Sequence, residues 1–271
     1  MKVYFINLDR SRERLDWFRR QTADMDIDLV RVPAIDAKEL SGAEIERLRS
    51  LSSGRNSLSA GELGCFLSHR KIWKKVVEDN APWAFIAEDD IHFSRDAGNF
   101  LRSDDWIPAG IDMIKAETAL KRVELGAEVL SKPFGHELRR LISYHLCSGG
   151  YFLTPGAAAH LLAYSDKHCE PVDEVLFSPK YGVLKHLSCL QLSPAICIQD
   201  AHLQERSGKG MLQSVIEHER VATRKHAREK RLTARLLREA RRLGRQGANL
   251  IREMYLRGTR RAVFRKVSFL G

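Results

Sequence analysis

Apolar runs and amphipathic stretches alternate along the first part of the chain. Residues 2–8 contain almost no polar side chain and predict a buried strand. Residues 9–21 follow at once with apolar positions at helical spacing, and they predict a helix that begins near Asp9 or Ser11. Residues 28–36 predict a second strand. A strand, a helix and a strand therefore open the chain.

Residues 59–79 give the longest helical pattern. Ser59 and Glu62 have the spacing of a capping box, which predicts that the helix begins there. Two apolar stretches follow, at residues 83–90 and 111–117, and both predict strands. These elements continue the alternation of strands and helices.

Residues 149–164 predict a strand followed by a second long helix. Thr154 is suited to the N-cap, and Pro155 is favoured at the first helical position. Residues 118–145 give no pattern that predicts an element. The alternation as a whole predicts an α/β fold with a mostly parallel central sheet, flanking helices and a site at the carboxyl ends of the strands.

Charge divides the chain into two predicted parts. Residues 206–271 hold 19 Lys and Arg against 5 Glu, a net charge of +14, whereas residues 1–205 carry a net charge of −4. We therefore predict a folded domain over 1–205 and a basic amphipathic helical tail over 206–271. The tail carries an apolar stripe at helical spacing: Leu232, Leu236, Ala240, Leu243, Leu250 and Met254.

A basic amphipathic helix is typical of binding to an anionic membrane surface. Two alternatives stay open: a solvated arm without a partner, and a nucleic-acid-binding segment. The nucleic-acid alternative is the weakest, because the chain contains no helix-turn-helix, zinc or aromatic RNA-binding pattern.

Cysteine use and hydropathy indicate the compartment. The chain has 5 cysteines, an odd number without a Cys-x-x-Cys pair, which favours reduced thiols in the cytosol over disulfides or a structural zinc site. Neither a signal peptide nor a stretch long enough to span a membrane is predicted. We expect a cytoplasmic protein, held peripherally at the inner face of the cytoplasmic membrane by residues 206–271.

Three consecutive carboxylates, Glu88, Asp89 and Asp90, form the end of the strand predicted at 83–90. Two carboxylates about 4 Å apart repel by roughly 1 kcal/mol in water and about 4 kcal/mol at a protein-like dielectric. In extended backbone Glu88 and Asp90 point the same way, so this pair can share a hard cation such as Mn²⁺ or Mg²⁺. A solvated acidic turn or a helix N-cap is the alternative. We refer to these three residues as the acidic triplet.

Three segments together resemble glycosyltransferase family 25, which contains bacterial lipooligosaccharide galactosyltransferases and collagen galactosyltransferases. They are VYFINLDRSRERLDWF at 3–18, GELGCFLSHRKIWKKV at 61–76 and AFIAEDDIHF at 84–93. The resemblance extends over roughly residues 1–200. It implies a GT-A fold, a nucleotide-sugar donor, an inverting reaction and an acidic metal-binding motif.

The resemblance also implies roles for particular residues. Asp90 and Glu88 are the expected metal ligands, with Glu88 or Asp89 also able to contact a metal ligand or the ribose. The expected donor-binding residues are Asn7, Asp9, Arg10, Arg14, Ser68, His69, Glu88 and Asp89. Two alternatives stay open: Arg10 and Arg14 belong to a solvated helix start, and His69 is a structural histidine. Cys65 is expected to pack as a small apolar residue.

An inverting transfer needs a general base that deprotonates the acceptor hydroxyl. Asp173 is the first candidate, because it follows a proline and matches the Pro-x-Asp position of the family. Glu174 and Glu117 are the alternates, and Asp173 can instead be a helix N-cap.

The expected function is metal-dependent transfer of a hexose, with galactose as the expected sugar. The donor is expected to be a UDP-sugar, and the acceptor a lipid-linked oligosaccharide of lipooligosaccharide or lipopolysaccharide. Two other functions are weighed against it: nucleic-acid binding through the tail, and metal-dependent phosphate-ester hydrolysis at the acidic triplet. A hydrolase would need further Asp and His ligands at recognisable spacing, and the sequence offers none.

Overall fold

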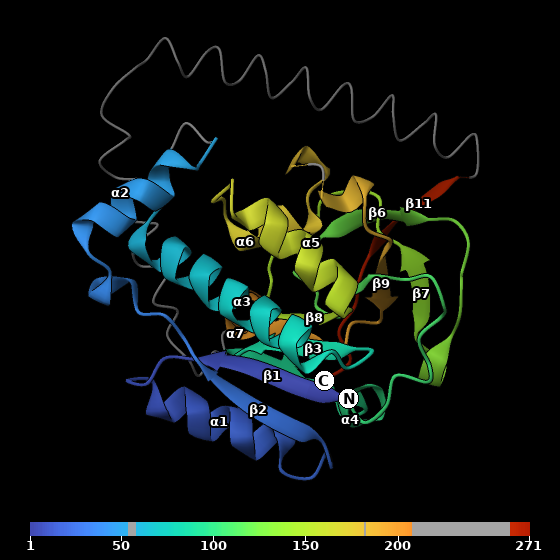
Figure 1. Cartoon of the computed structure of the whole chain (residues 1–271). Coiled ribbons are helices and arrows are strands. Elements are labelled where there is room, and N and C mark those ends of the chain that lie inside the picture. Colours follow the sequence, from blue (N-terminus) through green and yellow to red (C-terminus); the bar gives the residue numbers. More distant parts are fainter. Residues whose placement is uncertain (54–57, 182, 208–260) are drawn as a thin grey trace.

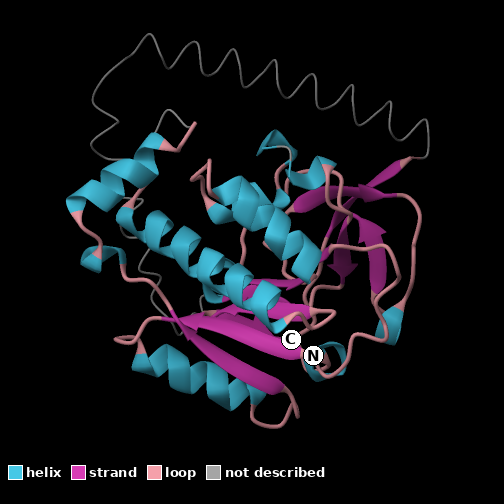
Figure 2. Cartoon of the chain, in the orientation of Figure 1, coloured by secondary structure: helices cyan, strands magenta, loops and turns pink. Residues whose placement is uncertain are grey.

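The computed structural model describes residues 1–53, 58–181, 183–207 and 261–271 (Figure 1). A central seven-stranded sheet lies between helices (Figure 2). Its strand order is β2 (Asp28–Pro33), β1 (Lys2–Asn7), β3 (Ala84–Glu88), β8 (Gly150–Leu153), β5 (Met113–Lys115), β9 (Cys189–Ser193) and β7 (Glu137–Arg140).

The sheet is mixed, so the prediction of a mostly parallel sheet was wrong. Strand β1 runs parallel to β2 and β3, and β5 runs parallel to β9, but β8 is antiparallel to both of its neighbours and β7 is antiparallel to β9. The start of β8 explains its direction. The Glu88 N–H donates to Gly149 O, and the Ala116 N–H donates to Gly150 O. Because β8 begins beside the ends of β3 and β5, it has to run back between them.

Helices cover both faces of the sheet and divide the core in two. On one face lie α1 (Arg12–Thr22) and α4 (Ala97–Leu101), and on the other lie α3 (Ala60–Asp79), α5 (Pro155–Ser165) and α6 (Val172–Phe177) (Figure 1). Alternate residues of β1 point to the two faces, as its nearly continuous burial requires. Phe5 stacks on Phe18 of α1 at 4.4 Å between ring centroids, whereas Tyr4 belongs to the core beneath α3.

Three predicted helix starts are confirmed. Helix α1 begins at Arg12, with Ser11 as its N-cap residue. The Glu62 N–H donates to Ser59 Oγ at 3.2 Å, and the Ser59 N–H donates back to Glu62 Oε2 at 2.9 Å. Thr154 Oγ1 accepts from the Ala157 N–H at the start of α5. Sequence analysis predicted neither the further α-helices nor the short 3₁₀ helices: α2 (Gly42–Ser50), α7 (Asp200–Ser207), η1 (Ala37–Glu39), η2 (Pro133–Gly135), η3 (Pro179–Tyr181) and η4 (Val183–Lys185).

Two small antiparallel sheets flank the central one. Strand β4 (Ile91–Phe93) pairs with β10 (Cys197–Gln199), directly after the acidic triplet. Strand β6 (Arg122–Gly126) pairs with β11 (Ala262–Lys266). Strands β6 and β7 occupy the stretch 118–145, for which the sequence predicted no element.

The C-terminal residues of the predicted tail pack on the folded body. Val267 is fully buried, and its carbonyl oxygen accepts from Thr118 Oγ1 at 2.8 Å. The Ala195 N–H donates to Ser268 O at 2.8 Å. The apolar stripe that begins at Leu232 lies outside the described residues, so the amphipathic helix and the division at 205 and 206 stay predictions.

In the part of the chain that the structure describes, no helix is long and apolar enough to cross a membrane.

Candidate active site

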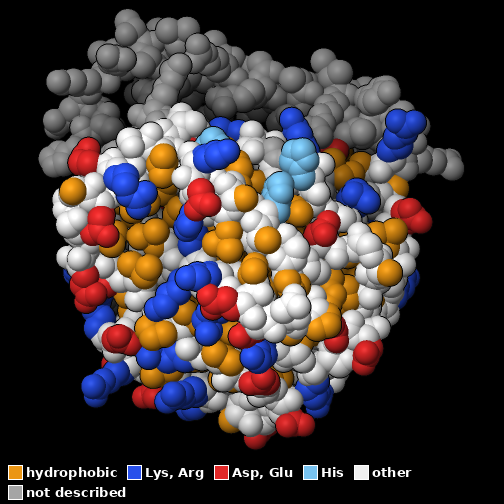
Figure 3. Space-filling view, in the orientation of Figure 1, with side chains coloured by type: hydrophobic (Ala, Val, Ile, Leu, Met, Phe, Trp, Pro, Cys, Tyr) orange, Lys and Arg blue, Asp and Glu red, His pale blue; other side chains and the backbone are white. Residues whose placement is uncertain are grey.

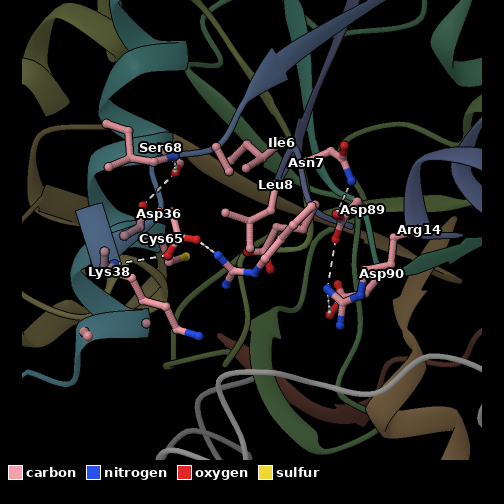
Figure 4. Close-up of a pocket in the computed structure, with 18 residues that line it drawn as sticks. Ile6, Asn7, Leu8, Arg14, Asp36, Lys38, Cys65, Ser68, Asp89 and Asp90 are labelled. Carbon is pink, nitrogen blue, oxygen red and sulfur yellow. Dashed lines mark hydrogen bonds and ion pairs between the residues drawn. The ribbon is translucent and has the colours of Figure 1, made fainter. Parts of the chain in front are cut away.

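A pocket of about 800 Å³, open to solvent, lies where β2, β1 and β3 end (Figure 4). Its walls are residues 6–8 and 34–38, the first turns of α3 and the acidic triplet. Its position is the one that α/β sheets use for ligands, and the sequence predicted it.

Helix α3 approaches the wall at 35–37 closely because residue 64 is a glycine. A Cβ atom at Gly64 would lie 2.7 Å from Ile35 O and 3.3 Å from Ala37 N. Ser68, one turn further on, fastens the same wall, since its Oγ accepts from the Ile35 N–H at 2.8 Å and donates to Gly64 O at 2.6 Å. Ser68 therefore lines the pocket and also holds its shape.

Asp89 points toward β1 and α1, where it meets two donors. Asn7 Nδ2 donates to its Oδ2 at 2.7 Å, and Arg14 Nη1 donates to its Oδ1 at 2.9 Å (Figure 4). The same Arg14 nitrogen lies 3.7 Å from Asp90 Oδ2. Burial disfavours the charged guanidinium, but the carboxylates of Asp90 and Asp89 outweigh it and raise the Arg14 pKa. Arg14 is thus the cation that offsets part of the repulsion within the acidic triplet.

Glu88 and Asp90 both face one amide group. Gln199 Nε2 donates to Glu88 Oε2 at 3.0 Å and lies 3.5 Å from Asp90 Oδ1. Burial, and then the charge of Glu88, raises the pKa of Asp90 to about 7. The Glu88 carboxyl is also buried, but hydrogen bonds from His69 and Ser148 overcome that penalty and lower its pKa. The two hard oxygen ligands converge, so the donor set fits Mn²⁺ or Mg²⁺.

His69 does not line the pocket; it is fully buried behind Glu88. Its Nε2 lies 3.3 Å from Glu88 Oε1, and its Nδ1 lies 2.8 Å from the hydroxyl of Tyr151. That hydroxyl accepts from Trp73 Nε1 at 2.9 Å, which leaves its own proton for His69 Nδ1 and places the imidazole proton on Nε2, toward Glu88. This chain of hydrogen bonds fixes the Glu88 carboxylate, so His69 acts on the pocket through Glu88.

Cys65 was expected to be apolar packing, but it is half-buried and lines the pocket. It lies one helical turn before His69 on α3. Among the described residues, Cys65, His69 and Glu88 form a group whose possible ligand atoms all lie within 4.8 Å of one another.

The opposite end of the pocket contains residues that sequence analysis did not single out. Asp36 forms an ion pair with Arg10, and its Oδ1 accepts from the Lys38 N–H at 3.1 Å. Figure 4 shows Asp36 and Lys38 on the side away from Arg14. The signal was present in the sequence, since Asp36 ends a predicted strand. It was missed because the sequence analysis did not consider that β1 and β2 are neighbours in the sheet, which brings Asp36 close to Arg10.

Asp9 and Asp173 lie outside this pocket. Asp9 has an exposed side chain and pairs with Arg31. Asp173 is in the first turn of α6, where its Oδ1 accepts from the Glu174 N–H at 2.9 Å. Its Oδ2 accepts from the Cys147 N–H at 3.2 Å and from the Tyr144 hydroxyl at 3.4 Å.

Asp173 and Glu88 nevertheless contact two consecutive residues, Cys147 and Ser148. Cys147 donates its N–H to Asp173, and Ser148 donates its hydroxyl to Glu88 Oε1 at 2.7 Å. A residue can span only a few ångströms. The carboxylate proposed as base and the acidic triplet therefore border the same small region of the molecule.

Glu117, an alternate base, is fully enclosed beneath this region. Its Oε2 accepts from the Gly149 N–H at 2.8 Å and lies 3.5 Å from the buried Lys115 ammonium. Burial raises the pKa of Glu117 to about 8. A Cβ atom at Gly149 would lie 3.0 Å from Glu117 Oε1, so the main chain closes over this carboxyl.

Residues 1–176 match the family described as Glycosyltransferase family 25 (LPS biosynthesis protein). The matched range contains the whole pocket and both long helices. The chain belongs to glycosyltransferase family 25.

Two similar proteins come from Haemophilus influenzae. The chain is 34% identical over 192 residues to the "Lipooligosaccharide biosynthesis protein lex-1", which covers 67% of this chain and 62% of that protein. It is 25% identical over 227 residues to the "Lipooligosaccharide biosynthesis protein lic2B", covering 80% and 82%.

A third relative is the "Lacto-N-neotetraose biosynthesis glycosyltransferase LgtB" of Neisseria meningitidis serogroup B, 29% identical over 181 residues, covering 63% of this chain and 66% of that protein. The matched region thus spans slightly less than two thirds of both lex-1 and LgtB.

The fit of α3 against the pocket wall leads to a prediction with a matched control. Gly64→Ala should destabilise the protein by about 1–3 kcal/mol, because the added methyl group meets backbone atoms of residues 35 and 37. Gly156→Ala, in helix α5, adds the same atom where nothing lies within 4 Å, and should stabilise by about 0.5–1 kcal/mol. Denaturant unfolding of both variants tests this, and equal effects would contradict the proposed packing.

Proposed function

We propose that the chain is an inverting, metal-dependent glycosyltransferase of the GT-A type. In this proposal it transfers a hexose, galactose, from a UDP-sugar to a lipooligosaccharide or lipopolysaccharide acceptor. The observation that carries it is a pocket at the ends of β2, β1 and β3, with Glu88, Asp90 and Arg14 together at one end. Family membership and the relatives named for lipooligosaccharide synthesis favour this function over nucleic-acid binding and over phosphate-ester hydrolysis.

The two ends of the pocket suit the two parts of a nucleotide-sugar. Asp36 and Lys38 offer a carboxylate and an ammonium for the nucleoside end, where a carboxylate after a strand suits a ribose hydroxyl. Arg14 lies at the other end, where its guanidinium can bind diphosphate oxygens. Asn7 orients Asp89, and Asp89 in turn holds Arg14. The predicted contact of Asp9 with the donor stays a prediction.

Glu88 and Asp90 are the residues that would hold the divalent cation. When bound there, a Mn²⁺ or Mg²⁺ ion supplies Lewis-acid stabilisation of the diphosphate leaving group. Gln199 orients both carboxylates, and His69 fixes the one of Glu88 from behind. These contacts keep the two ligands in place before the donor arrives, which lowers the reorganisation that catalysis requires.

Asp173 is the proposed general base. It would take the proton from the acceptor hydroxyl as that oxygen attacks the sugar carbon on the face opposite the leaving diphosphate. Its support is its position, since consecutive residues, Cys147 and Ser148, contact Asp173 and Glu88. The Tyr144 hydroxyl and the Cys147 N–H hold the carboxylate in one orientation.

The basic segment of the chain is proposed to bind an anionic membrane surface. Its charge comes from the sequence: 206–271 carries a net charge of +14. On the face of the described body that Figure 3 shows, Lys and Arg side chains are interspersed with Asp and Glu, so basic charge is not gathered there. Attraction to anionic lipid contributes about 1 kcal/mol per basic residue near the surface.

The metal ligands are tested by Asp90→Asn. We expect transfer from UDP-sugars to be nearly abolished and Mn²⁺ binding, measured by calorimetry, to weaken, because one of two ligand charges is lost. Stability without metal should hold or rise, since repulsion from Glu88 falls. Asp16→Asn, at an exposed position of α1, is the control and should change neither property. Wild-type turnover of Asp90→Asn at limiting Mn²⁺ would refute the assignment.

The base is tested by Asp173→Asn. Turnover should fall about 10²-fold or more, the usual contribution of general-base catalysis, while affinity for the UDP-sugar changes little. Glu174→Gln, the next residue of the same helical turn, is the control and should retain most of the turnover. If Asp173→Asn instead weakens UDP-sugar binding and leaves saturated turnover normal, the residue belongs to the donor pocket.

Truncation after Arg206 would also remove β11 and the buried Val267, so charge removal is the cleaner test of membrane binding. Binding to anionic vesicles should be lost when six tail arginines become glutamine: Arg231, Arg235, Arg238, Arg241, Arg242 and Arg245. It should persist when six exposed cations of the body are changed in the same way: Arg12, Arg19, Arg20, Lys74, Lys121 and Lys167. Equal loss in both variants would argue against a specific role of the tail.

A further inference from the structure

Glu88 borders two groups of possible ligands with different chemistry. Its Oε2 faces Gln199 and Asp90, which is the side proposed for the hard divalent cation. Its Oε1 faces His69, at 3.3 Å from Nε2. Cys65 belongs to the same group, since the possible ligand atoms of Cys65, His69 and Glu88 all lie within 4.8 Å of one another. One carboxylate therefore separates an oxygen-only pair from a set with one sulfur, one nitrogen and one oxygen.

The backbone explains why the sulfur and the nitrogen meet. Cys65 and His69 are four residues apart on α3, so their side chains lie on the same face of the helix, one turn apart. That face is directed toward the end of β3, where Glu88 stands. Cys65 lines the pocket, which gives an ion a route from solvent, whereas His69 is fully buried.

We propose that Cys65, His69 and Glu88 bind Zn²⁺, and that this ion inhibits the enzyme. Sulfur and imidazole ligands favour Zn²⁺ over Mg²⁺ or Mn²⁺, and three protein ligands with an open side toward the pocket are a usual zinc arrangement. Inhibition, but not the binding itself, rests on the function proposed above. A Zn²⁺ ion held on Oε1 withdraws negative charge from Glu88 and adds a like charge beside the activating cation.

The protons can be accounted for with residues already in place. Zn²⁺ binds the thiolate of Cys65, so the thiol proton is released to solvent. His69 stays neutral and changes tautomer: Nε2 gives its lone pair to the ion, and Nδ1 carries the proton. The Tyr151 oxygen, 2.8 Å from Nδ1, then accepts that proton as a hydrogen bond, and the hydroxyl of Tyr151 has to turn its own proton away from His69. Histidine ligands are usually oriented by such a contact at the second ring nitrogen.

Cobalt is a suitable probe, because Co²⁺ occupies zinc sites and a thiolate ligand gives it a near-ultraviolet charge-transfer band. The full chain, stripped of metal with a chelator, is titrated with Co²⁺ and then with Zn²⁺. We expect the band to appear at one equivalent, to be removed by Zn²⁺ and to survive an excess of Mg²⁺. The band should be absent in Cys65→Ser and in His69→Asn.

Cys147→Ser is the matched control. Cys147 is the other half-buried thiol among the described cysteines, and its Sγ lies 3.0 Å from His202 Nε2, so it is the alternative thiol–imidazole pair. The band should survive this substitution. Tyr151→Phe should weaken Zn²⁺ binding about 10- to 100-fold, as loss of a contact behind a metal ligand does. Circular dichroism shows whether each variant is folded.

Several outcomes would overturn the site: no band in the wild-type chain, a band that persists in folded Cys65→Ser, or a band lost in Cys147→Ser. For the effect on catalysis, Zn²⁺ should raise the Mn²⁺ concentration needed for half-maximal transfer in the wild type, and raise it less in Cys65→Ser. If the cobalt band behaves as expected while no UDP-sugar supports transfer, the zinc site stands and the proposed function fails. If transfer is found but Zn²⁺ leaves the Mn²⁺ requirement unchanged, the inhibitory role is wrong.

Discussion

Negative charge at the end of β3 is the constraint on which the rest of the site depends. Three carboxylates follow one another there, and each has its own solution. Arg14 and Asn7 donate hydrogen bonds to Asp89, whereas His69, Ser148 and Gln199 donate hydrogen bonds to Glu88. Asp90 has the weakest compensation of the three carboxylates. Burial and the charge of Glu88 raise its pKa to about 7. Asp90 is therefore the carboxylate whose charge the proposed cation would compensate most.

The surrounding fold serves that arrangement from several distant parts of the chain. Helix α3 supplies His69 and comes close because residue 64 is glycine. The antiparallel strand β8 begins beside the end of β3, and this places Ser148 against Glu88 and Tyr151 behind His69. A parallel strand in the same position would enter the sheet from its other edge. The mixed direction of the sheet is therefore part of how the site is built.

Sequence reasoning was most successful where a pattern is local. The strands β1, β2 and β3 and the helices α1 and α3 could be predicted, because periodicity and capping depend on near neighbours. The edge of the sheet that carries the pocket could be predicted too, but α2, β4 and α4 could not. The direction of β8 and the contact of Gln199 with Glu88 could not be predicted, because both depend on residues far apart in the chain. Asp36 was missed because its ion-pair partner Arg10 lies in the loop after β1, the strand next to β2.

The roles of site residues could be predicted only in part. The expected opposition of Asp89 to Glu88 and Asp90 assumed extended backbone, but β3 ends at Glu88 and residues 89–90 form a turn. Arg14 Nη1 therefore lies near both Asp89, at 2.9 Å, and Asp90, at 3.7 Å. The sequence of α3 alone could not show whether His69 contacts a ligand or a carboxylate. Its partners Tyr151 and Glu88 belong to the strands β8 and β3. Cys65 was taken for packing because a single thiol in an amphipathic helix carries no local signal.

The pairing of β11 with β6 also bears on the order in which the molecule is completed during synthesis. Thr118 and Val267, which are hydrogen-bonded, are separated by 149 positions in the chain. A ribosome therefore makes every residue of the pocket, and then residues 206–261, before it makes the strand that closes the second small sheet. Contacts between such distant residues form late, since loop closure must come first. Strand β6 thus lacks its partner β11 until almost the whole chain has been made.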